Sequence, residues 1–364
     1  MVRTPLFISM LLLFSCSVRP IVKTDSDQQL STEVKNTLVP PLELLWKTSV
    51  STAPARNLAF YKNNLLIPNL YDKLCVLDIS KGKVFKRMKV RHPVLDGVVV
   101  KGSDLIWTSP SNQGAVYKIS LVKPKEHLKS RSDGGFVRPL VLDDQIIVAS
   151  IDNVLRSLSI EDLKPDWSVE LDAAVRQEIA IAGEHILFTT ENGLLYSIKR
   201  ETGKVIFKRK LPCIPTTGIF LDDDFGYLGS RDGKLLKFEI SSGQIEWITK
   251  TDGRIITKPL LADDNILIGD CANTLYIVDA MIGEILDTID TGAPISTDFV
   301  RSGEYIYWGD LSHNINCLKL SEKKIVWSYK LQGRLRTNPA IYRGLIFIGS
   351  EDRYIYAFYS KNGN

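Results

Sequence analysis

The sequence predicts an all-β fold: an eight-bladed β-propeller of four-stranded antiparallel blades, closed into a ring by an N-terminal strand. Three observations predict it, namely a 40-residue repeat, four short strand-like runs within each repeat, and a strand-like segment near the N-terminus that no other strand precedes. The repeat is marked by residues of one type spaced 40 apart, such as Gly203, Gly243 and Gly283, and Thr217, Thr257, Thr297 and Thr337. Such a period is typical of proteins in which each unit buries its apolar face against its neighbours.

Each repeat contains four runs rich in β-branched and aliphatic residues, separated by Gly, Asp and Asn. In residues 257–288, apolar runs alternate with the polar breaks Asp263–Asn265 and Asp270–Asn273, and Gly283 marks the last turn. Short runs of this kind predict strands joined by hairpins. The pairs Asn192-Gly193 and Asp232-Gly233 lie between second and third strands, where we expect both residues of each pair to have positive φ.

The number of blades follows from the number of second-strand segments. There are eight: Leu65–Pro68, Leu105–Thr108, Ile146–Ala149, Ile186–Thr189, Phe225–Gly229, Ile266–Gly269, Tyr305–Gly309 and Leu345–Gly349. The last repeat ends before its fourth strand. The segment Glu43–Val50, with Trp46, is similar to the fourth strands around Trp247 and Trp327. We therefore expect it to complete the last blade and remove the open sheet edge.

Composition favours one large domain, residues 41–364, rather than the two that 364 residues alone would suggest. The net charge is +4, and we expect Lys and Arg to be spread through the repeats, which gives no indication of nucleic-acid binding.

Residues 1–15 have the pattern of a signal peptide. A short basic start is followed by the mostly apolar run 6–14, which is too short to span a bilayer. Residues 13–16, ending at Cys16, resemble a bacterial lipobox, which implies lipidation of Cys16. The alternative is an ordinary secretory signal cleaved elsewhere. Residues 16–40 are then expected to be a lipidated cysteine and a flexible tether.

Four further cysteines are expected to be small buried hydrophobes, with a disulfide as the alternative. By the repeat register, Cys75 and Cys317 fall on third strands, Cys271 at a hairpin turn and Cys213 in a loop between blades. The sequence does not determine their pairing.

The third strand, turn and fourth strand of each repeat carry a recognisable motif. Residues 275–285, 235–247 and 75–84 resemble the pyrroloquinoline-quinone-type repeat, and the likeness spans residues 43–363, weakening at Leu121–Lys129. In it a turn glycine precedes an aromatic residue by four positions, as in Gly243 and Trp247, and we expect the aromatic ring to lie between blades. Lys323 stands at the glycine's position in one repeat.

That repeat occurs in two functional classes. Quinoprotein dehydrogenases have a vicinal cysteine pair and clustered cation ligands, and this chain has no Cys-Cys pair. Its acidic runs, Asp143-Asp144, Asp222–Asp224 and Asp263-Asp264, recur between first and second strands, which favours turn punctuation over catalysis. The four histidines, His92, His127, His185 and His313, have no metal-ligand spacing. We therefore expect no catalytic residue, no metal and no cofactor.

The second class is the BamB-type family of lipid-anchored propellers of the outer-membrane β-barrel assembly machinery, which the chain resembles in size, lipobox, blade number and closing strand. The resemblance implies a non-enzymatic lipoprotein on the periplasmic face of the outer membrane, with a BamA-like barrel subunit as partner. The alternatives are a quinoprotein or ligand-binding propeller, and an envelope scaffold with another partner.

Arginines are the candidate partner-binding residues. Those on or just before innermost strands should line one mouth of the central channel: Arg138, Arg176, Arg254, Arg334 and Arg336. They either solvate a polar channel mouth or form a docking rim for carboxylates. By the same register, the acidic turns at Asp143, Asp223 and Asp263 should make the opposite mouth negative.

Overall fold

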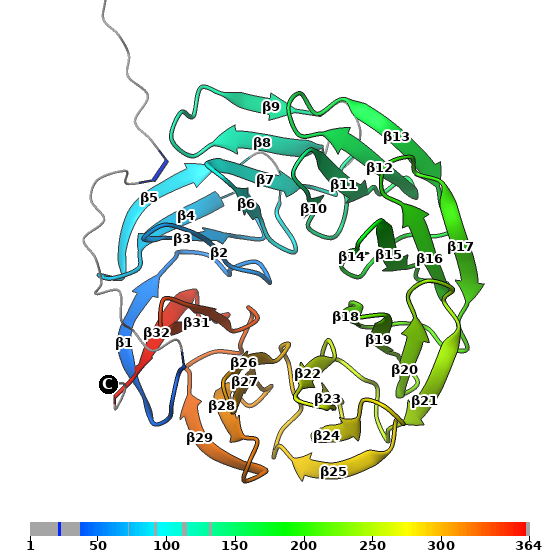
Figure 1. Ribbon diagram of the computed structural model, residues 1–364. Coiled ribbons are helices and arrows are strands. Elements are labelled where there is room, and N and C mark those ends of the chain that lie inside the picture. Colours follow the sequence, from blue (N-terminus) through cyan, green and yellow to red (C-terminus); the bar gives the residue numbers. More distant parts are fainter. Residues whose placement is uncertain are drawn as a thin grey trace, which may run out of the picture.

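The computed structural model describes residues 21–22, 37–71, 73–90, 93–110, 115–130 and 133–361. Within these residues, eight four-stranded antiparallel sheets are arranged in a ring around a central axis, which confirms the predicted propeller (Figure 1). Residues 1–15 and Cys16 lie outside the described residues.

Each blade begins with a short inner strand and, except in blade 2, ends with a longer outer strand. Blade 1 consists of β2 (Ala59–Tyr61), β3 (Asn64–Pro68), β4 (Lys73–Asp78) and β5 (Lys83–Lys89). Blade 2 consists of β6 (Val99–Lys101), β7 (Asp104–Thr108), β8 (Val116–Ser120) and β9 (His127–Lys129). Blade 3 consists of β10 (Leu140–Val141), β11 (Gln145–Ala149), β12 (Val154–Ser159) and β13 (Pro165–Glu170). Blade 4 consists of β14 (Ala180–Ala182), β15 (His185–Thr189), β16 (Leu194–Lys199) and β17 (Val205–Lys210).

The second half of the ring keeps the same order. Blade 5 consists of β18 (Phe220–Asp222), β19 (Phe225–Gly229), β20 (Lys234–Glu239) and β21 (Ile245–Lys250). Blade 6 consists of β22 (Leu260–Ala262), β23 (Asn265–Gly269), β24 (Thr274–Asp279) and β25 (Ile285–Asp290). Blade 7 consists of β26 (Val300–Ser302), β27 (Tyr305–Gly309), β28 (Asn314–Lys319) and β29 (Lys324–Lys330). Blade 8 consists of β30 (Ala340–Tyr342), β31 (Leu345–Gly349), β32 (Tyr354–Ser360) and, from the other end of the chain, β1 (Leu42–Ser49).

The ring is closed as predicted. β1 pairs antiparallel with β32, from Leu42 opposite Ser360 to Ser49 opposite Tyr354. Trp46 of β1 donates its indole N–H to the carbonyl of Ile79 in blade 1, at 2.8 Å. The closing strand thus supplies both the missing strand of blade 8 and the contact to the next blade.

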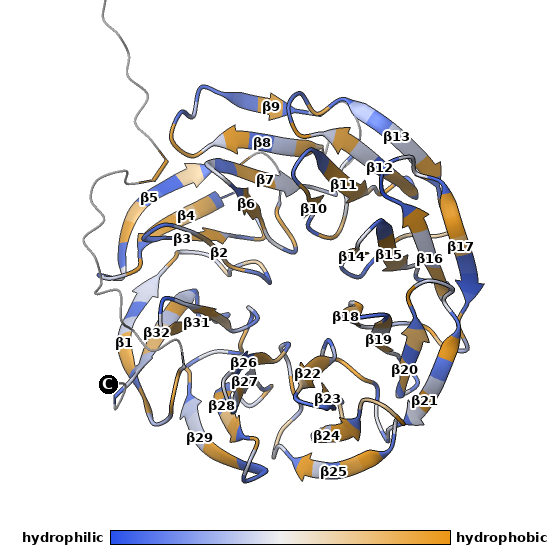
Figure 2. Cartoon of the chain, in the orientation of Figure 1, coloured by the Kyte–Doolittle hydropathy of each residue, from blue (hydrophilic) through white to orange (hydrophobic). Residues whose placement is uncertain are grey.

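The core lies between the blades. The second and third strands are almost fully buried, whereas fourth strands such as β5 and β13 alternate between exposed and half-buried residues. Figure 2 shows the outer strands with more hydrophilic residues than the strands they cover. A repeated hydrogen bond fixes each inner segment, because the hydroxyls of Thr217, Thr257, Thr297 and Thr337 accept from the N–H of Gly229, Gly269, Gly309 and Gly349 at 2.7–2.8 Å.

The aromatic residues of the motif lie against glycines of the following blade, which confirms their expected place. A Cβ on Gly82, Gly203 or Gly283 would come within 2.5–2.7 Å of the indole of Trp46, Trp167 or Trp247, and these glycines have positive φ. Only glycine meets both demands. The sixth blade differs, because Asp287 replaces the aromatic residue and forms a 2.9 Å ion pair with Lys323, the residue that replaces the glycine.

The hairpin turns between second and third strands differ in one detail from the expectation. Gly193 and Gly233 have positive φ, but Asn192 and Asp232 do not. The N–H of Gly233 bonds to the carbonyl of Ser230, three residues back, so the turn needs only one left-handed residue.

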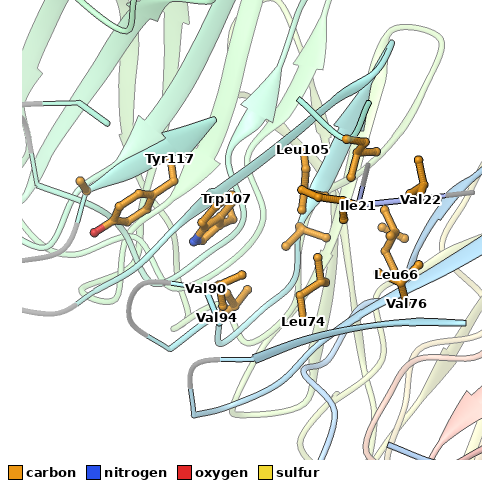
Figure 3. Close-up of a cluster of buried hydrophobic side chains, with 14 residues drawn as sticks. Ile21, Val22, Leu66, Leu74, Val76, Val90, Val94, Leu105, Trp107 and Tyr117 are labelled. Carbon is orange, nitrogen blue, oxygen red and sulfur yellow. The ribbon is translucent and has the colours of Figure 1, made fainter. Parts of the chain in front are cut away.

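Two described parts of the N-terminal segment contact the ring. Ile21 and Val22 are both 1% exposed and pack in the cluster between blades 1 and 2, with Leu66, Leu105 and other apolar side chains (Figure 3). Leu38 is also buried, and its N–H bonds to Ser302 at 2.7 Å. These three apolar side chains interrupt the polar segment and bind it to the ring. Among the described residues no helix is long and apolar enough to cross a membrane.

Candidate functional site at the axial channel

A belt of polar residues, one from the start of each blade, surrounds the axis. Its members are Asn57, Asp96, Arg138, Glu178, Gly218, Lys258, Asp298 and Asn338. We call this set the axial belt. Its side chains bond from blade to blade: Asn57 to Asp96 at 3.0 Å, Arg138 to Glu178 at 2.6 Å and Asn338 to Asn57 at 3.1 Å. Backbone N–H groups of Arg138, Lys258 and Asp298 donate to side chains of Asp96, Asp298 and Asn338 at 2.8–3.0 Å.

Blade 5 contributes the one belt residue without a side chain. Lys258 of blade 6 reaches past Gly218 and its Nζ lies 3.2 Å from Oε2 of Glu178 in blade 4. A Cβ on Gly218 would lie 3.5 Å from Glu178 and 3.6 Å from Lys258. The glycine therefore leaves room for an ion pair between blades that are not neighbours, and this ion pair completes the belt.

The belt balances its own charges. Asp96, Glu178 and Asp298 are acidic, while Arg138, Lys258 and the adjacent Arg56, which lies 3.2 Å from Asp298, are basic. Burial acts to raise the pKa of Glu178, but the charges of Arg138 and Lys258 outweigh it and hold that pKa below its usual range. Burial raises the pKa of Asp96, and the hydrogen bond from the backbone of Arg138 only partly opposes this shift.

A cavity of about 190 Å³ lies on the axis beside the belt, lined by Arg56, Phe136, Arg176, Thr217 and belt residues. Arg176 places its guanidinium 3.7 Å from the ring centroid of Phe136 and bonds to Glu191 at 3.2 Å. Stacking of this kind holds an arginine fork in a defined orientation while leaving part of its edge exposed.

The five predicted arginines do not form one cluster. Arg176 lines the axial cavity, whereas Arg138 is half-buried in the belt and pairs with Glu178, a residue of the cavity lining. Arg254 and Arg334 are exposed beside the turns between second and third strands, where their carbonyls accept from the N–H of Cys271 and Glu351 at 3.0 and 2.8 Å. Arg336 lines a separate groove of about 560 Å³ with Lys73, Glu351 and Arg353.

The acidic turns lie where expected, between first and second strands, and Asp223 and Asp263 take positive φ. That conformation supports their interpretation as turn-forming residues. The expected negative mouth is largely wrong, however, because neighbouring blades supply cations. Asp143 pairs with Lys101 at 2.5 Å, and Asp263 with Arg301 at 2.8 Å.

The cysteines take the predicted positions, and the four that the structure describes are free thiols. Cys75, Cys213 and Cys317 are buried as expected, whereas Cys271 is exposed at its turn, where the expectation of a buried residue is wrong. Burial raises the pKa of Cys75 and Cys213 to about 11 and that of Cys317 to about 12.

Three of the histidines occupy strand or turn positions, namely His127 and His185 at the starts of β9 and β15, and His313 in a turn with φ 74°. His92 lies outside the described residues. In the part of the chain that the structure describes, no group of three or more His, Cys, Asp or Glu residues could hold a metal ion.

The axial belt was not predicted from the sequence. A signal for it exists, because Arg138, Glu178, Gly218, Lys258, Asp298 and Asn338 are spaced 40 apart immediately after the repeat's threonine position. Their residue types differ from repeat to repeat, and a search for identical residues passes over them. Alternating charge at one register position was the signal.

Comparison with known proteins bears on the whole ring. Among solved structures, BamB from Moraxella catarrhalis superposes with a TM-score of 0.72 at 15% identity, over 87% of this chain and 99% of that one. The computationally designed Ika8 protein gives 0.73 at 13% identity, over 85% and 97%. At these identities both likenesses show the fold alone.

Relatives named outer membrane protein assembly factor BamB match part of the chain. That of Legionella pneumophila (strain Paris) is 23% identical over 181 residues, 46% of this chain and 47% of the relative. That of Taylorella asinigenitalis (strain MCE3) is 22% identical over 170 residues, 43% and 44% of the two chains. The chain thus spans about half the length of these relatives. The family described as outer membrane protein assembly factor BamB matches residues 43–217, 214–302 and 272–364, and the chain belongs to this family.

Proposed function

We propose that this chain is a non-enzymatic, lipid-anchored scaffold on the periplasmic face of the outer membrane. In this role it binds a BamA-like barrel subunit and assists the assembly of outer-membrane β-barrel proteins. The observation that carries the proposal is the family match, which extends over the ring from residue 43 to residue 364. The names of the relatives state a role in the assembly of outer membrane proteins.

The exposed arginines are the proposed docking residues. Arg176, Arg254 and Arg334 lie beside the turns between second and third strands, and all three are exposed. A planar guanidinium offers five donors to carboxylates and backbone carbonyls. A rigid closed ring keeps their positions fixed, so little conformational entropy is lost when a partner binds. Arg138 and Arg336 are also proposed docking residues. Arg138 is expected to contribute less to partner binding, because its guanidinium is already paired with Glu178.

Attachment through Cys16 is part of the proposal. Three acyl chains bury dozens of methylenes at about 0.8 kcal/mol each, so the acylated protein should remain entirely with membranes. Cys16→Ser should yield a soluble periplasmic form or a retained precursor. Incorporation of labelled palmitate into the Cys16→Ser variant would contradict acylation at this residue.

The test of function is the identity of the proteins that co-purify with the tagged chain from detergent-solubilised envelope. A BamA-like barrel subunit is the expected result. A different envelope protein, captured reproducibly in its place, would overturn the assembly role. Purified chain supplied with pyrroloquinoline quinone and calcium should not reduce a dye with alcohols or aldoses, and turnover in that assay would overturn the non-enzymatic role.

A further inference from the structure

The segment that follows the proposed lipid anchor is docked on the propeller at one defined place. The N–H of Ile21 donates to the carbonyl of Leu121 at 2.8 Å, and the side chains of Ile21 and Val22 are buried in the seam between blades 1 and 2. Blade 2 has only a three-residue outer strand, β9, and an irregular stretch before it. The docked residues pack against buried apolar side chains of both blades, such as Leu66 of blade 1 and Leu105 of blade 2.

Docking so near the anchor limits how far the propeller can lie from a membrane. Ile21 follows Cys16 by five residues, a reach of at most about 17 Å when fully extended. Four strands about 4.8 Å apart make each blade about 14 Å deep, and blades face one another across the axis, so the ring is much wider than this reach (Figure 1). An acyl chain on Cys16 would therefore hold the outer edge of blades 1 and 2 against the bilayer, instead of letting the ring turn freely on a long tether.

The outer edge of these two blades is basic. Residues 80–91, which include β5, contain six Lys or Arg and no Asp or Glu, and residues 121–132 of blade 2 contain four against one Glu. This clustering departs from the even spread of charge expected from the sequence. We call the exposed residues Lys83, Arg87, Lys89, Lys123 and Lys125 the basic edge. The outer strand of blade 3, in contrast, is acidic, with Asp166 and Glu170.

Apolar side chains lie within the same edge. Phe85 of β5 is 39% exposed and Leu128 of β9 is 36% exposed. Cations that surround a partly exposed aromatic side chain suit the headgroup region of a bilayer, where charge meets anionic phosphate and the ring reaches the acyl boundary.

We propose that the basic edge of blades 1 and 2 is a membrane-contacting surface that binds anionic phospholipid headgroups and sets the orientation of the ring. The proposal rests on the proposed acylation of Cys16. With that edge toward the bilayer, the propeller axis lies along the membrane plane, and both mouths of the channel face sideways. The arginines beside the turns of one mouth are then accessible to a membrane-embedded partner.

The test uses acylated full-length protein reconstituted in vesicles of phosphatidylethanolamine and phosphatidylglycerol, with no partner protein present. In a Cys271→Ala background, a fluorophore is attached at Phe85→Cys in β5 or at Ile206→Cys in β17. The two positions lie three residues after their turn glycines, Gly82 and Gly203, and both are partly exposed. Phospholipids spin-labelled at the headgroup should quench the fluorophore at position 85 and leave the one at position 206 unaffected. Equal quenching at the two positions, or none at position 85, would overturn the proposal.

Charge and docking are separated by matched variants. Lys83→Gln with Arg87→Gln and Lys89→Gln should abolish quenching at position 85. Lys204→Gln with Lys208→Gln and Lys210→Gln removes the same charge at the same register of blade 4 and should leave the quenching intact. Ile21→Asp should weaken the quenching but not abolish it, because it releases the seam and lengthens the tether while the basic edge stays intact. Retained quenching in the basic-edge variant would contradict the role of charge.

A failure of acylation is recognised separately from a failure of the proposal. Acylation is read from the mass of the N-terminal peptide and from co-flotation with vesicles. The Cys16→Ser chain should still bind phosphatidylglycerol vesicles at low salt. This binding should be lost near 1 M salt, because the screening length falls to about 3 Å. It should also be lost when the substitutions of the basic-edge variant are added. Binding that is equal on phosphatidylcholine vesicles would contradict recognition of anionic headgroups.

Discussion

Lys258 and Glu178 form an ion pair across two blades, because Gly218 leaves the position between them without a side chain. This pair closes the axial belt and ties together blades that are not adjacent in the ring. Most contacts in a propeller run from each blade to the next, so a contact that skips a blade, such as this pair or that of Arg56 in blade 1 with Asp298 in blade 7, adds a constraint on the radius of the ring.

The first prediction concerns the size of residue 218. Gly218→Ala should change the free energy of unfolding by less than about 0.5 kcal/mol, because its Cβ would meet Glu178 and Lys258 at ordinary contact distances. Gly218→Leu should destabilise by about 1–3 kcal/mol, since it forces Lys258 away from Glu178. Denaturant unfolding of both variants measures the difference, and equal stability of Ala and Leu would contradict the account of the belt.

The lowered pKa of Glu178 predicts how the stability of the protein changes with pH. The pKa of Glu178 is lowered in the folded state, so its stabilising contribution is complete above its unfolded pKa of about 4.3 and is lost as the pH falls through the lower folded value. Wild type should exceed Glu178→Gln by about 1–3 kcal/mol at pH 7, with a gap that narrows below about pH 4. A gap that widens on acidification would contradict this sign.

Asp96 provides the opposite case in the same belt. Its pKa is raised, so its contribution is complete below its unfolded pKa of about 3.9 and is lost as the pH rises through the folded value. The difference between wild type and Asp96→Asn should therefore become less favourable to wild type between about pH 4 and pH 7. Unfolding measured across that range provides the check.

In blade 6, Asp287 and Lys323 form an ion pair at the two positions that an aromatic residue and a glycine occupy in other blades. We therefore expect the effects of substitutions at these two positions on stability to be strongly coupled. Asp287→Trp alone should destabilise, because Lys323 occupies the place where the indole rests on a glycine in other blades. Adding Lys323→Gly should restore stability and also remove a residue with φ 53°. The double-mutant cycle should give a coupling of about 1–3 kcal/mol. Additive effects would show that the two positions are independent.

The closing strand gives a further prediction. Trp46→Ala should lower the free energy of unfolding by about 3–5 kcal/mol, because it leaves a cavity between blades 8 and 1 and removes the hydrogen bond to Ile79. Gly82→Ala should also destabilise, since its Cβ would lie 2.5 Å from the indole at φ 61°. Gly102→Ala, at φ 58° but with no atom within 4 Å, is the control that isolates the contact from the backbone strain. A Gly82→Ala effect no larger than that of Gly102→Ala would contradict the packing role of Trp46.

The ring was predictable because the same residue types recur every 40 residues in the sequence. Trp46 indicated the closing strand, since its surroundings repeat those of Trp247 and Trp327, and β1 pairs with β32 as that likeness required. Turn positions were predictable in the same way. Their detailed conformation was not, because Asn192 and Asp232 lie in turns that demand positive φ only at the following glycine.

The contacts between blades were not predictable from the repeat. Whether Asp263 is solvated or paired depends on Arg301, which lies 38 residues away in the next blade. The docking of Ile21 depends on the short outer strand of blade 2, a departure from the repeat whose consequence appears only in three dimensions. The candidate arginines do not lie in one cluster, and their neighbours, such as Glu178 for Arg138 and Phe136 for Arg176, decide which of them are available.

The measurement that tests the proposed function most directly is co-purification of the partner with charge-reversed variants. Arg176→Glu with Arg254→Glu and Arg334→Glu should abolish capture of the BamA-like subunit while thermal unfolding stays within a few degrees of wild type. The control, Asp224→Lys with Asp264→Lys, alters the opposite mouth at exposed positions without positive φ and should leave capture unchanged. Capture that survives in the arginine variant and is lost in the acidic-turn variant would contradict the proposed docking face.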